Sequence, residues 1–387
     1  MTVPSNNQPF SIGEFEQRWS SVGAAMDAYG VDAIIVTNSH NMAWLTGYAG
    51  TSSYIPQAAL YRRGDQYPYL ILRKQDVPAG IHTTPLPRDN IVGYPEALIG
   101  NPDKDGHDFV RQFLQDLGGL RTIGLEFEEV SHPTYEKYRG GLAPLNLVDV
   151  STLISEKRRI KSEREISLMK EAGKVVETGV LAAFEAARPG RRECDVAGDV
   201  VKALASGVDA FETIRIEVPE MAFGPRIGTG HYHWYEGTLE HGCQINFELV
   251  GVRHLYQVPL MRTISLGPPS DKLQRLFGGV REGLEEALSI IKPGATCCDV
   301  ANAFYRKLGE HGFEKDSRCG YTIGLTTAEN PSLQSSDQTV LEPNMTFHLM
   351  LGTWPEEDFG VTLSESFRVT ETGYETFSSL SRDLYIV

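Results

Sequence analysis

The sequence has few cysteines, no long apolar run and a deficit of positive charge. Lys and Arg number 36 against 51 Asp and Glu, which gives a formal net charge of −15 and an isoelectric point near 5.2. Binding to a nucleic-acid backbone needs a basic surface, so no nucleic-acid partner is expected. No stretch approaches the ~18 consecutive apolar residues of a membrane-spanning helix, so no membrane association is expected either.

The cysteines also indicate the cellular compartment. The five are scattered, and none forms a C-x-x-C pair. An odd and scattered set is typical of a protein kept in a reducing compartment. The N-terminal stretch MTVPSNNQPFSIGEF is polar and lacks the charged start and apolar core of a signal peptide. We therefore expect a cytoplasmic protein, and a cysteine nucleophile stays open as a minor alternative.

The first part of the chain alternates helical and strand patterns. Such alternation predicts an α/β domain. The pattern changes near residues 150–156, which predicts two domains, 1–155 and 156–387. In the first domain we expect helices at 15–30 and 107–119, strands at 32–38 and 121–128, and a hairpin at 58–74.

The second part begins with a long helix and contains a repeat. Ser162 followed by Glu165 has the form of a capping box, and Pro189-Gly190 ends the helical pattern. The segments EAARPGRRECDVAGDVVKAL and SIIKPGATCCDVANAFYRKL share the order helix, Pro-Gly, Cys-Asp-Val, helix, about 104 residues apart. This repetition predicts an internal duplication within one domain.

Between the two copies, the stretch QINFELVGVRHLYQVPLMRT predicts a pair of strands. An apolar run reaches Glu248, a glycine turn is expected at Gly251, and a second strand ends at Arg262-Thr263. A carboxylate within an apolar strand is costly unless it is paired or functional, and burial raises its pKa. Glu248 is therefore a candidate catalytic group, and a hydrogen-bonded structural role is the alternative.

Over nearly its whole length the chain resembles the pita-bread family of creatinases, prolidases, and proline-specific and methionine aminopeptidases. The similarity lies in the KRRIKSEREISLMKEAG helix, the duplicated halves and the ending VLEPNMTFHLMLG…GVTLSESFRVTETG. It implies an α/β (α+β) protein with a small creatinase-like N-terminal domain and a C-terminal pita-bread domain with internal duplication. It also implies a homodimer in which the N-terminal domain of one subunit closes the pocket of the other.

Metal-dependent members of that family carry two aspartates, a histidine and two glutamates, which suit a pair of divalent ions. The resemblance places these five ligands at Glu248, Pro259, Tyr321, Met350 and Ser364, or at Glu365 for the last if the register slips by one. Proline has no donor, methionine is a soft ligand and a neutral tyrosine is a poor one. We therefore expect no metal ion and no other cofactor.

Creatinases and ectoine hydrolases are the metal-free members, and the detailed motifs are similar to those of ectoine hydrolases. The resemblance implies hydrolysis of a C–N bond in a small cyclic amidine, with ectoine or 5-hydroxyectoine as the leading substrate. Glu248 would attack the ring carbon and His231 would protonate the leaving nitrogen, whereas activation of water by Glu248 is the competing route. The shared motifs are NMAWLTGY (41–48), DNIVGY (89–94), FEL (247–249), PL-x-RT (259–263), GY-x-IGL (320–325) and MTFH (345–348).

Further residues are candidates for substrate contact. A tyrosine hydroxyl can hold a substrate or donate to a developing charge, and an aromatic cage suits a cationic heterocycle. Core packing is the competing interpretation for the aromatic residues, and a mutual ion pair is the competing interpretation for Arg262 and Glu365. The candidates are Tyr321, Glu365, Trp44, Tyr48, His233, Trp234, Arg262 and Met350.

Several departures leave the substrate open. Thr51 and Ser52 stand where the resemblance leads us to expect an aromatic residue, and Gln257 stands in place of a histidine. The first alternative is a creatinase-like amidinohydrolase acting on another guanidino or amidine compound. Met261, in the position of its usual carboxylate, argues against creatine itself. A non-catalytic binding protein is the second alternative, and a metallopeptidase is the least favoured.

Overall fold

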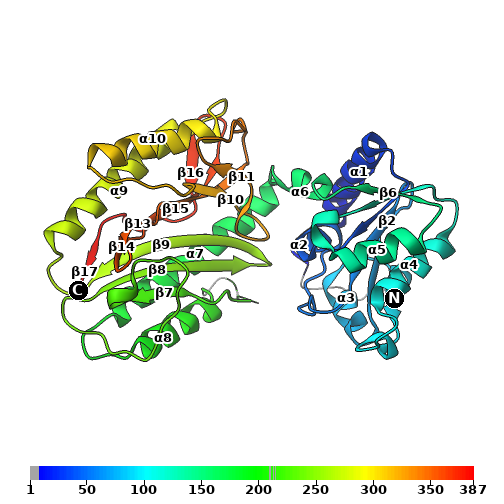
Figure 1. Cartoon of the computed structure of the whole chain (residues 1–387), viewed down its shortest axis with the longest axis horizontal. Coiled ribbons are helices and arrows are strands. Elements are labelled where there is room, and N and C mark those ends of the chain that lie inside the picture. The colour runs from blue at the N-terminus through cyan, green and yellow to red at the C-terminus, as the bar shows by residue number, and fades with distance from the viewer. Residues whose placement is uncertain (1–7, 209–210, 212, 214) are drawn as a thin grey trace. The chain divides into compact units, whose positions relative to one another are not determined.

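The computed structural model describes residues 8–208, 211, 213 and 215–387. The chain divides into two compact units, Met1–Arg158 and Arg159–Val387 (Figure 1). We call these unit 1 and unit 2. Within the described part of the chain, no helix is long and apolar enough to cross a membrane.

Unit 1 is built on one six-stranded sheet with the order β4-β3-β2-β1-β5-β6. Strand β1 pairs parallel with β5 and antiparallel with β2. The expected helices and strands of this unit are confirmed as α1, α4, β1, β5 and the β2–β3 hairpin. The elements are α1 (Ile12–Tyr29), β1 (Ala33–Val36), α2 (Ser39–Thr46), β2 (Ala58–Arg62), β3 (Tyr69–Arg73), α3 (Val77–Thr83), β4 (Ile91–Tyr94), α4 (Gly106–Leu117), β5 (Thr122–Leu125), α5 (His132–Gly141), β6 (Asn146–Asp149) and α6 (Leu153–Arg158).

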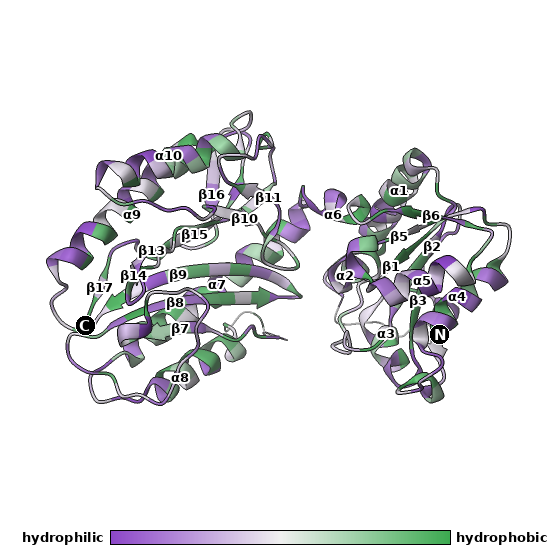
Figure 2. Cartoon of the chain, viewed as in Figure 1, coloured by the Kyte–Doolittle hydropathy of each residue, from purple (hydrophilic) through white to green (hydrophobic). Residues whose placement is uncertain are grey.

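Local sequence explains where the helices of unit 1 begin and end. Helix α1 begins after Ser11, whose side chain accepts a hydrogen bond from the backbone, and ends at Gly30 with φ of 66°. Helix α4 begins with a capping box between Asp105 and Asp108. The central strands carry the hydrophobic residues of this unit, as Figure 2 shows for β1 and β2, and Ile35 in β1 is fully buried.

Among its described residues, unit 2 contains a four-stranded, a five-stranded and a two-stranded sheet (β13-β14) and two pairs of helices, and every strand pair is antiparallel except β17 with β9. The four-stranded sheet has the order β17-β9-β8-β7, and the five-stranded sheet has the order β11-β10-β12-β15-β16. Each half contains a helix pair, α7 with α8 and α9 with α10, as the repeat predicts (Figure 1). The elements are α7 (Glu163–Ala186), α8 (Glu193–Ser206), β7 (Glu220–Phe223), β8 (Gln244–Arg253), β9 (Tyr256–Ser265), α9 (Asp271–Ile290), α10 (Cys297–Glu310), β10 (Gly320–Thr322), β11 (Glu329–Leu333), β12 (Thr346–Met350), β13 (Thr353–Glu356), β14 (Phe359–Val361), β15 (Ser364–Val369), β16 (Tyr374–Thr376) and β17 (Tyr385–Ile386).

The predicted strand pair is confirmed as β8 and β9, but the prediction of its turn is wrong. Gly251 lies inside β8, and the turn is formed by His254 and Leu255, with φ of 44° and 71°. A Cβ atom on Gly251 would lie 2.1 Å from the carbonyl oxygen of Ala172 in α7. Glycine is therefore required at position 251 because helix α7 and strand β8 approach closely. Besides a turn or bulge, a close approach of this kind is a common reason for glycine in a strand.

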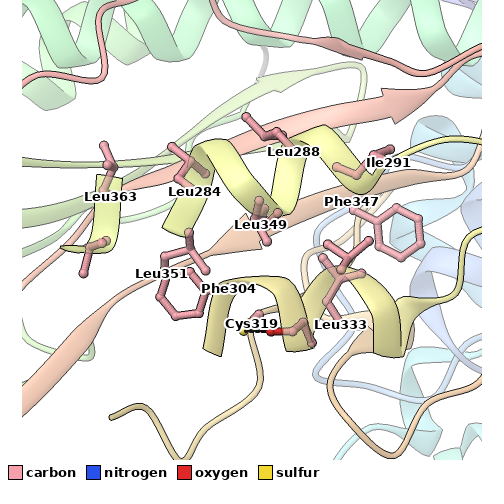
Figure 3. Packing of buried hydrophobic residues seen from close by; sticks show 14 of the residues in the cluster. Leu284, Leu288, Ile291, Phe304, Cys319, Leu333, Phe347, Leu349, Leu351 and Leu363 are labelled. Carbon is pink, nitrogen blue, oxygen red and sulfur yellow. Dashed lines mark hydrogen bonds between the residues drawn. The ribbon is translucent and has the colours of Figure 1, made fainter. Parts of the chain in front are cut away.

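Strand β12 separates the hydrophobic core of the second half from a polar layer. Phe347 and Leu349 belong to the cluster formed with α9 and α10, including Leu284 and Phe304 (Figure 3). Side chains alternate along a strand, so the intervening His348 points to the opposite face. The core packing of β12 thus fixes the position of a buried histidine.

Candidate active site

Glu248 lies near the middle of β8, on the face of the sheet that points away from α7. Its neighbours Phe247 and Leu249 are buried, and Leu249 lies beside Gly179 of α7. Alternation along the strand therefore directs Glu248 to the other face. In register, Glu248 pairs with Met261 of β9 and with Glu220 of β7.

The environment of Glu248 favours the neutral form of its carboxyl group. The side chain retains only 13% exposure. Burial raises its pKa to about 8, the negative charge of Glu220 adds to that rise, and a hydrogen bond from Tyr321 opposes it. A carboxyl group with this pKa sits in the range that suits proton transfer or ionisation on ligand binding.

Tyr321, His348 and Ser364 form a polar chain that ends at Glu248. The Tyr321 hydroxyl lies 3.2 Å from Nδ1 of His348, and Nε2 of His348 lies 2.8 Å from Oγ of Ser364. Oγ of Ser364 accepts a hydrogen bond of 2.8 Å from the backbone N–H of Met261. His348 is fully buried, which lowers its pKa to about 3, so its imidazole is neutral at physiological pH.

Glu220 is a second carboxyl group beside Glu248, and sequence reasoning did not select it. Burial raises its pKa, while the charges of His231 and His233 act in the opposite direction. A carboxylate within the apolar run VPEMAF was the available sequence signal, of the same kind that singled out Glu248. Two adjacent carboxyl groups disfavour double ionisation, which makes the pair a receptor for a cation.

The predicted histidines lie on the segment that runs beside β7. The backbone N–H of Met221 donates to the carbonyl oxygen of Tyr232 over 2.7 Å, which holds this segment against the strand. Nδ1 of His233 lies 3.0 Å from the carbonyl oxygen of Pro219, and both His231 and His233 are exposed residues. Trp234, half-buried, packs edge-on against His233 with ring centroids 5.9 Å apart. His231 and His233 thus lie close enough to Glu220 to act on its carboxyl group.

Arg262 follows Met261 in β9, so its side chain points to the face of the four-stranded sheet opposite Glu248, where it meets Glu365 of β15. Nη2 of Arg262 lies 2.8 Å from Oε1 of Glu365, and each side chain is only 1% exposed. Arg262 also donates to the backbone carbonyl oxygens of Met261, Ser364 and Ser381. These contacts correspond to the ion-pair alternative, so the structure gives no support to the predicted substrate contacts of Arg262 and Glu365.

Trp44 and Tyr48 lie in the core of unit 1. Their exposed fractions are 5% and 4%, and the guanidinium carbon of Arg18 lies 5.0 Å from the centre of the Trp44 ring. Rings covered in this way do not form an open aromatic cage. The core-packing alternative therefore fits both positions, and we do not propose Trp44 or Tyr48 as ligand contacts.

Comparison with known proteins identifies the family. Residues 167–371 match the model of "Metallopeptidase family M24", and residues 18–160 match the "Creatinase/Prolidase N-terminal domain". The chain belongs to family M24. Its pita-bread fold, with the creatinase-like N-terminal domain, is confirmed.

Relatives within the family carry hydrolase and peptidase names. An uncharacterized hydrolase/peptidase, y4tL, of Sinorhizobium fredii is 46% identical over the full length of both chains. The ectoine hydrolase of Halomonas elongata is 32% identical, with 98% of each chain covered. The Xaa-Pro dipeptidase structure from Bacillus anthracis has the same fold, with a TM-score of 0.82 at 22% identity over 96% of this chain and 100% of that one.

The donor set of this M24 chain does not fit the pair of divalent ions expected in metal-dependent relatives. Met350 pairs with Ser364 across β12 and β15, so Ser364, not Glu365, lies at the last ligand position. Tyr321 stays protonated because burial and the charge of Glu248 raise the pKa of its hydroxyl. With Pro259, these positions offer one thioether, two hydroxyls and Glu248. Within the described residues, no group of three or more His, Cys, Asp or Glu side chains could hold a metal ion.

Proposed function

We propose that this chain is a metal-independent hydrolase that opens a C–N bond of a small cyclic amidine, such as ectoine or 5-hydroxyectoine. The observation that carries the proposal is the set of groups around Glu248. A reactive carboxyl group, a second carboxyl group and a tyrosine hydroxyl meet where metal-dependent relatives are expected to hold ions. The full-length similarity to an ectoine hydrolase supports the substrate class.

Charge provides the reason for an amidine substrate. An amidinium ion placed against Glu248 and Glu220 favours ionisation of both carboxyl groups, because an opposite charge stabilises the charged form. The free protein keeps Glu248 largely neutral at pH 7, since its pKa is about 8. Binding of the cation therefore generates the nucleophile in place.

The proposed reaction proceeds in two steps. An oxygen of Glu248 forms a bond to the amidine carbon, and the ring C–N bond breaks as His231 delivers a proton to the leaving nitrogen. Water then attacks the same carbon and releases Glu248, with its proton returning to His231. The net change adds one water molecule to the amidine and yields a ring-opened amide with a free amine. Activation of water by Glu248 is the competing route to the same product.

Substrate contacts other than the reacting groups follow from the same cluster. The Tyr321 hydroxyl and Glu220 lie beside Glu248, and we assign them to binding and to charge stabilisation. His233, Trp234 and Met350 remain proposed contacts near this cluster. We also propose a cytoplasmic homodimer without a cofactor. The predicted domain division at residue 155 stays a prediction, close to the boundary of unit 1 at Arg158.

The test is product analysis with ectoine, 5-hydroxyectoine and creatine, each with and without a chelator. We expect ring-opened product from a cyclic amidine, unchanged by the chelator, and no product from the Glu248→Gln variant. The variant Tyr94→Phe, which loses a partly buried hydrogen bond of unit 1 to the carbonyl oxygen of Pro56, is the matched control and should retain turnover. Turnover of creatine alone would favour the amidinohydrolase alternative. The absence of turnover with every substrate would favour a binding protein.

A further inference from the structure

Five strands of unit 2 contribute to one ring of residues around Glu248, joined by polar contacts and, between β8 and β9, by strand pairing. Glu248 in β8 pairs in register with Met261 in β9, and the N–H of Met261 reaches Ser364 in β15. Ser364 reaches His348 in β12, and His348 reaches Tyr321 in β10. Tyr321 hydrogen-bonds to Glu248 and so closes the ring.

The hydrogen positions in this ring are determined by the need to satisfy buried groups. Oγ of Ser364 accepts from the N–H of Met261, so its own O–H requires an acceptor. Ser364 is fully buried, and Nε2 of His348 at 2.8 Å is the acceptor that the described residues supply. An imidazole proton on Nε2 would leave the serine hydroxyl hydrogen without a partner, which is costly in the interior. The neutral imidazole of His348 therefore carries its proton on Nδ1.

The tautomer of His348 then determines what Tyr321 does. The Nδ1–H of His348 faces the Tyr321 oxygen at 3.2 Å, and Glu248 is too distant to compete at 3.7 Å. The tyrosine oxygen accepts that hydrogen, so its own O–H is directed to the carboxylate of Glu248. Donation runs in one direction from the backbone of Met261 to Glu248.

We propose that His348 and Ser364 are positioning residues that hold Tyr321 as a hydrogen-bond donor to Glu248. In metal-dependent relatives, the metal ions are expected to position and stabilise the reactive oxygen group. We assign that function here to the ring of residues around Glu248. Three of its members, Glu248, Tyr321 and Ser364, stand at expected ligand positions of the family. Because His348 is buried and neutral, it does not act as a cationic acid.

The inference rests on the proposed function for its catalytic meaning, but it can be tested without substrate. The titration of Glu248 is followed by carbon NMR of carboxyl-labelled protein, assigned with Glu248→Gln, and the tautomer of His348 by nitrogen NMR of its ring. Other groups that act on Glu248 are Glu220 from β7, with His231 and His233 beyond it, and these stay unchanged in all variants. Arg318, stacked on Tyr321 at 4.7 Å, also stays unchanged.

The expected results are specific to the direction of donation. The nitrogen spectra should show the proton of His348 on Nδ1. The imidazole should gain no second proton between roughly pH 5 and pH 9, because burial disfavours its charged form. Tyr321→Phe should move the Glu248 titration upward by roughly one pH unit, since a donor to the carboxylate is lost. Ser364→Ala should release the tautomer of His348 and move the titration in the same direction by a smaller amount. The double variant should shift no further than Tyr321→Phe alone.

Two results would overturn the proposal. One is a proton on Nε2 of His348 in the unaltered protein. The other is full additivity of the Tyr321→Phe and Ser364→Ala shifts, which would show that the two residues act separately. If Ser364→Ala does not fold, His348→Phe replaces it and should produce the same upward shift. Tyr94→Phe is the control and should leave the titration of Glu248 unchanged. If the predicted hydrogen positions are observed but no amidine is hydrolysed, only the proposed function is refuted. If an amidine is hydrolysed but His348 has the opposite tautomer, only this inference is refuted.

Discussion

Replacement of Arg262 by methionine should be among the most destabilising single changes in unit 2. The guanidinium group is buried and donates to Glu365 and to the backbone carbonyl oxygens of Met261, Ser364 and Ser381. Methionine leaves these acceptors without their donor and leaves Glu365 as a buried carboxylate. Within the part of the chain that the structure describes, the other cation beside it is Arg382, whose Nε lies 3.3 Å from Oε1 of Glu365.

The magnitude follows from the burial of both partners. Removal of one member of a buried ion pair typically costs ~3–5 kcal/mol, because the other charge stays desolvated. Burial raises the pKa of Glu365, and Arg262 opposes that rise. In Arg262→Met the pKa of Glu365 rises further, so the folded protein takes up a proton. The loss of unfolding free energy should therefore be largest at high pH and should shrink as the pH falls toward the ordinary range of a carboxyl group.

The assay is urea unfolding followed by circular dichroism at several pH values. The double variant Arg262→Met/Glu365→Leu should recover much of the loss, because it removes the unpaired charge. Arg281→Met is the matched control, since Arg281 pairs with Asp383 at 2.8 Å with 42% and 71% exposure, and it should cost at most ~1 kcal/mol. A loss below ~1 kcal/mol for Arg262→Met, independent of pH, would refute the reasoning.

Three further predictions concern the site and its support. Because Glu248 must ionise to react, kcat/KM should rise with pH through the pKa of about 8, and Glu248→Gln should lower kcat by at least roughly 1000-fold in an amidine hydrolysis assay. Glu220→Gln removes a negative neighbour, so the rise in kcat/KM should move to lower pH. A rise that stays at its original pH would contradict the coupling of the two carboxyl groups. Gly251→Ala places a Cβ atom 2.1 Å from the carbonyl oxygen of Ala172 and should lower the melting temperature markedly, whereas Gly278→Ala, with open space around its Cβ, should not.

The sequence was most informative where short-range chemistry decides the structure. The capping box of Ser162 and Glu165 is present at the start of α7, and the repeated Pro-Gly segments follow the ends of α7 and α9. Each of these depends on residues a few positions apart, so one sequence is enough to recognise them. Gly251 misled the prediction because a glycine in a strand pattern has two common causes, and the relevant one is a helix far away in sequence.

The site was predictable only in part, because its members come together from distant strands. Glu248 was recognisable as a carboxylate in an apolar run. Glu220 carried the same kind of signal and was overlooked, whereas His348 was not selected because its importance comes from a partner 27 positions away in sequence. The side chains of Arg262 and Trp44 have the chemistry to bind a ligand, but in the fold both are buried against other groups of the protein. The burial of a single residue cannot be predicted from its sequence neighbours alone.

Strand β12 has a consequence for how this protein can diverge. Phe347 and Leu349 face the hydrophobic core, while His348 and Met350 face the polar layer. Substitutions at alternate positions of one short strand are therefore under separate constraints. A scan of every position should show changes in expression yield at Phe347 and Leu349, a changed rate at His348 and a changed substrate range at Met350. New specificities can then arise through Met350 without loss of the scaffold.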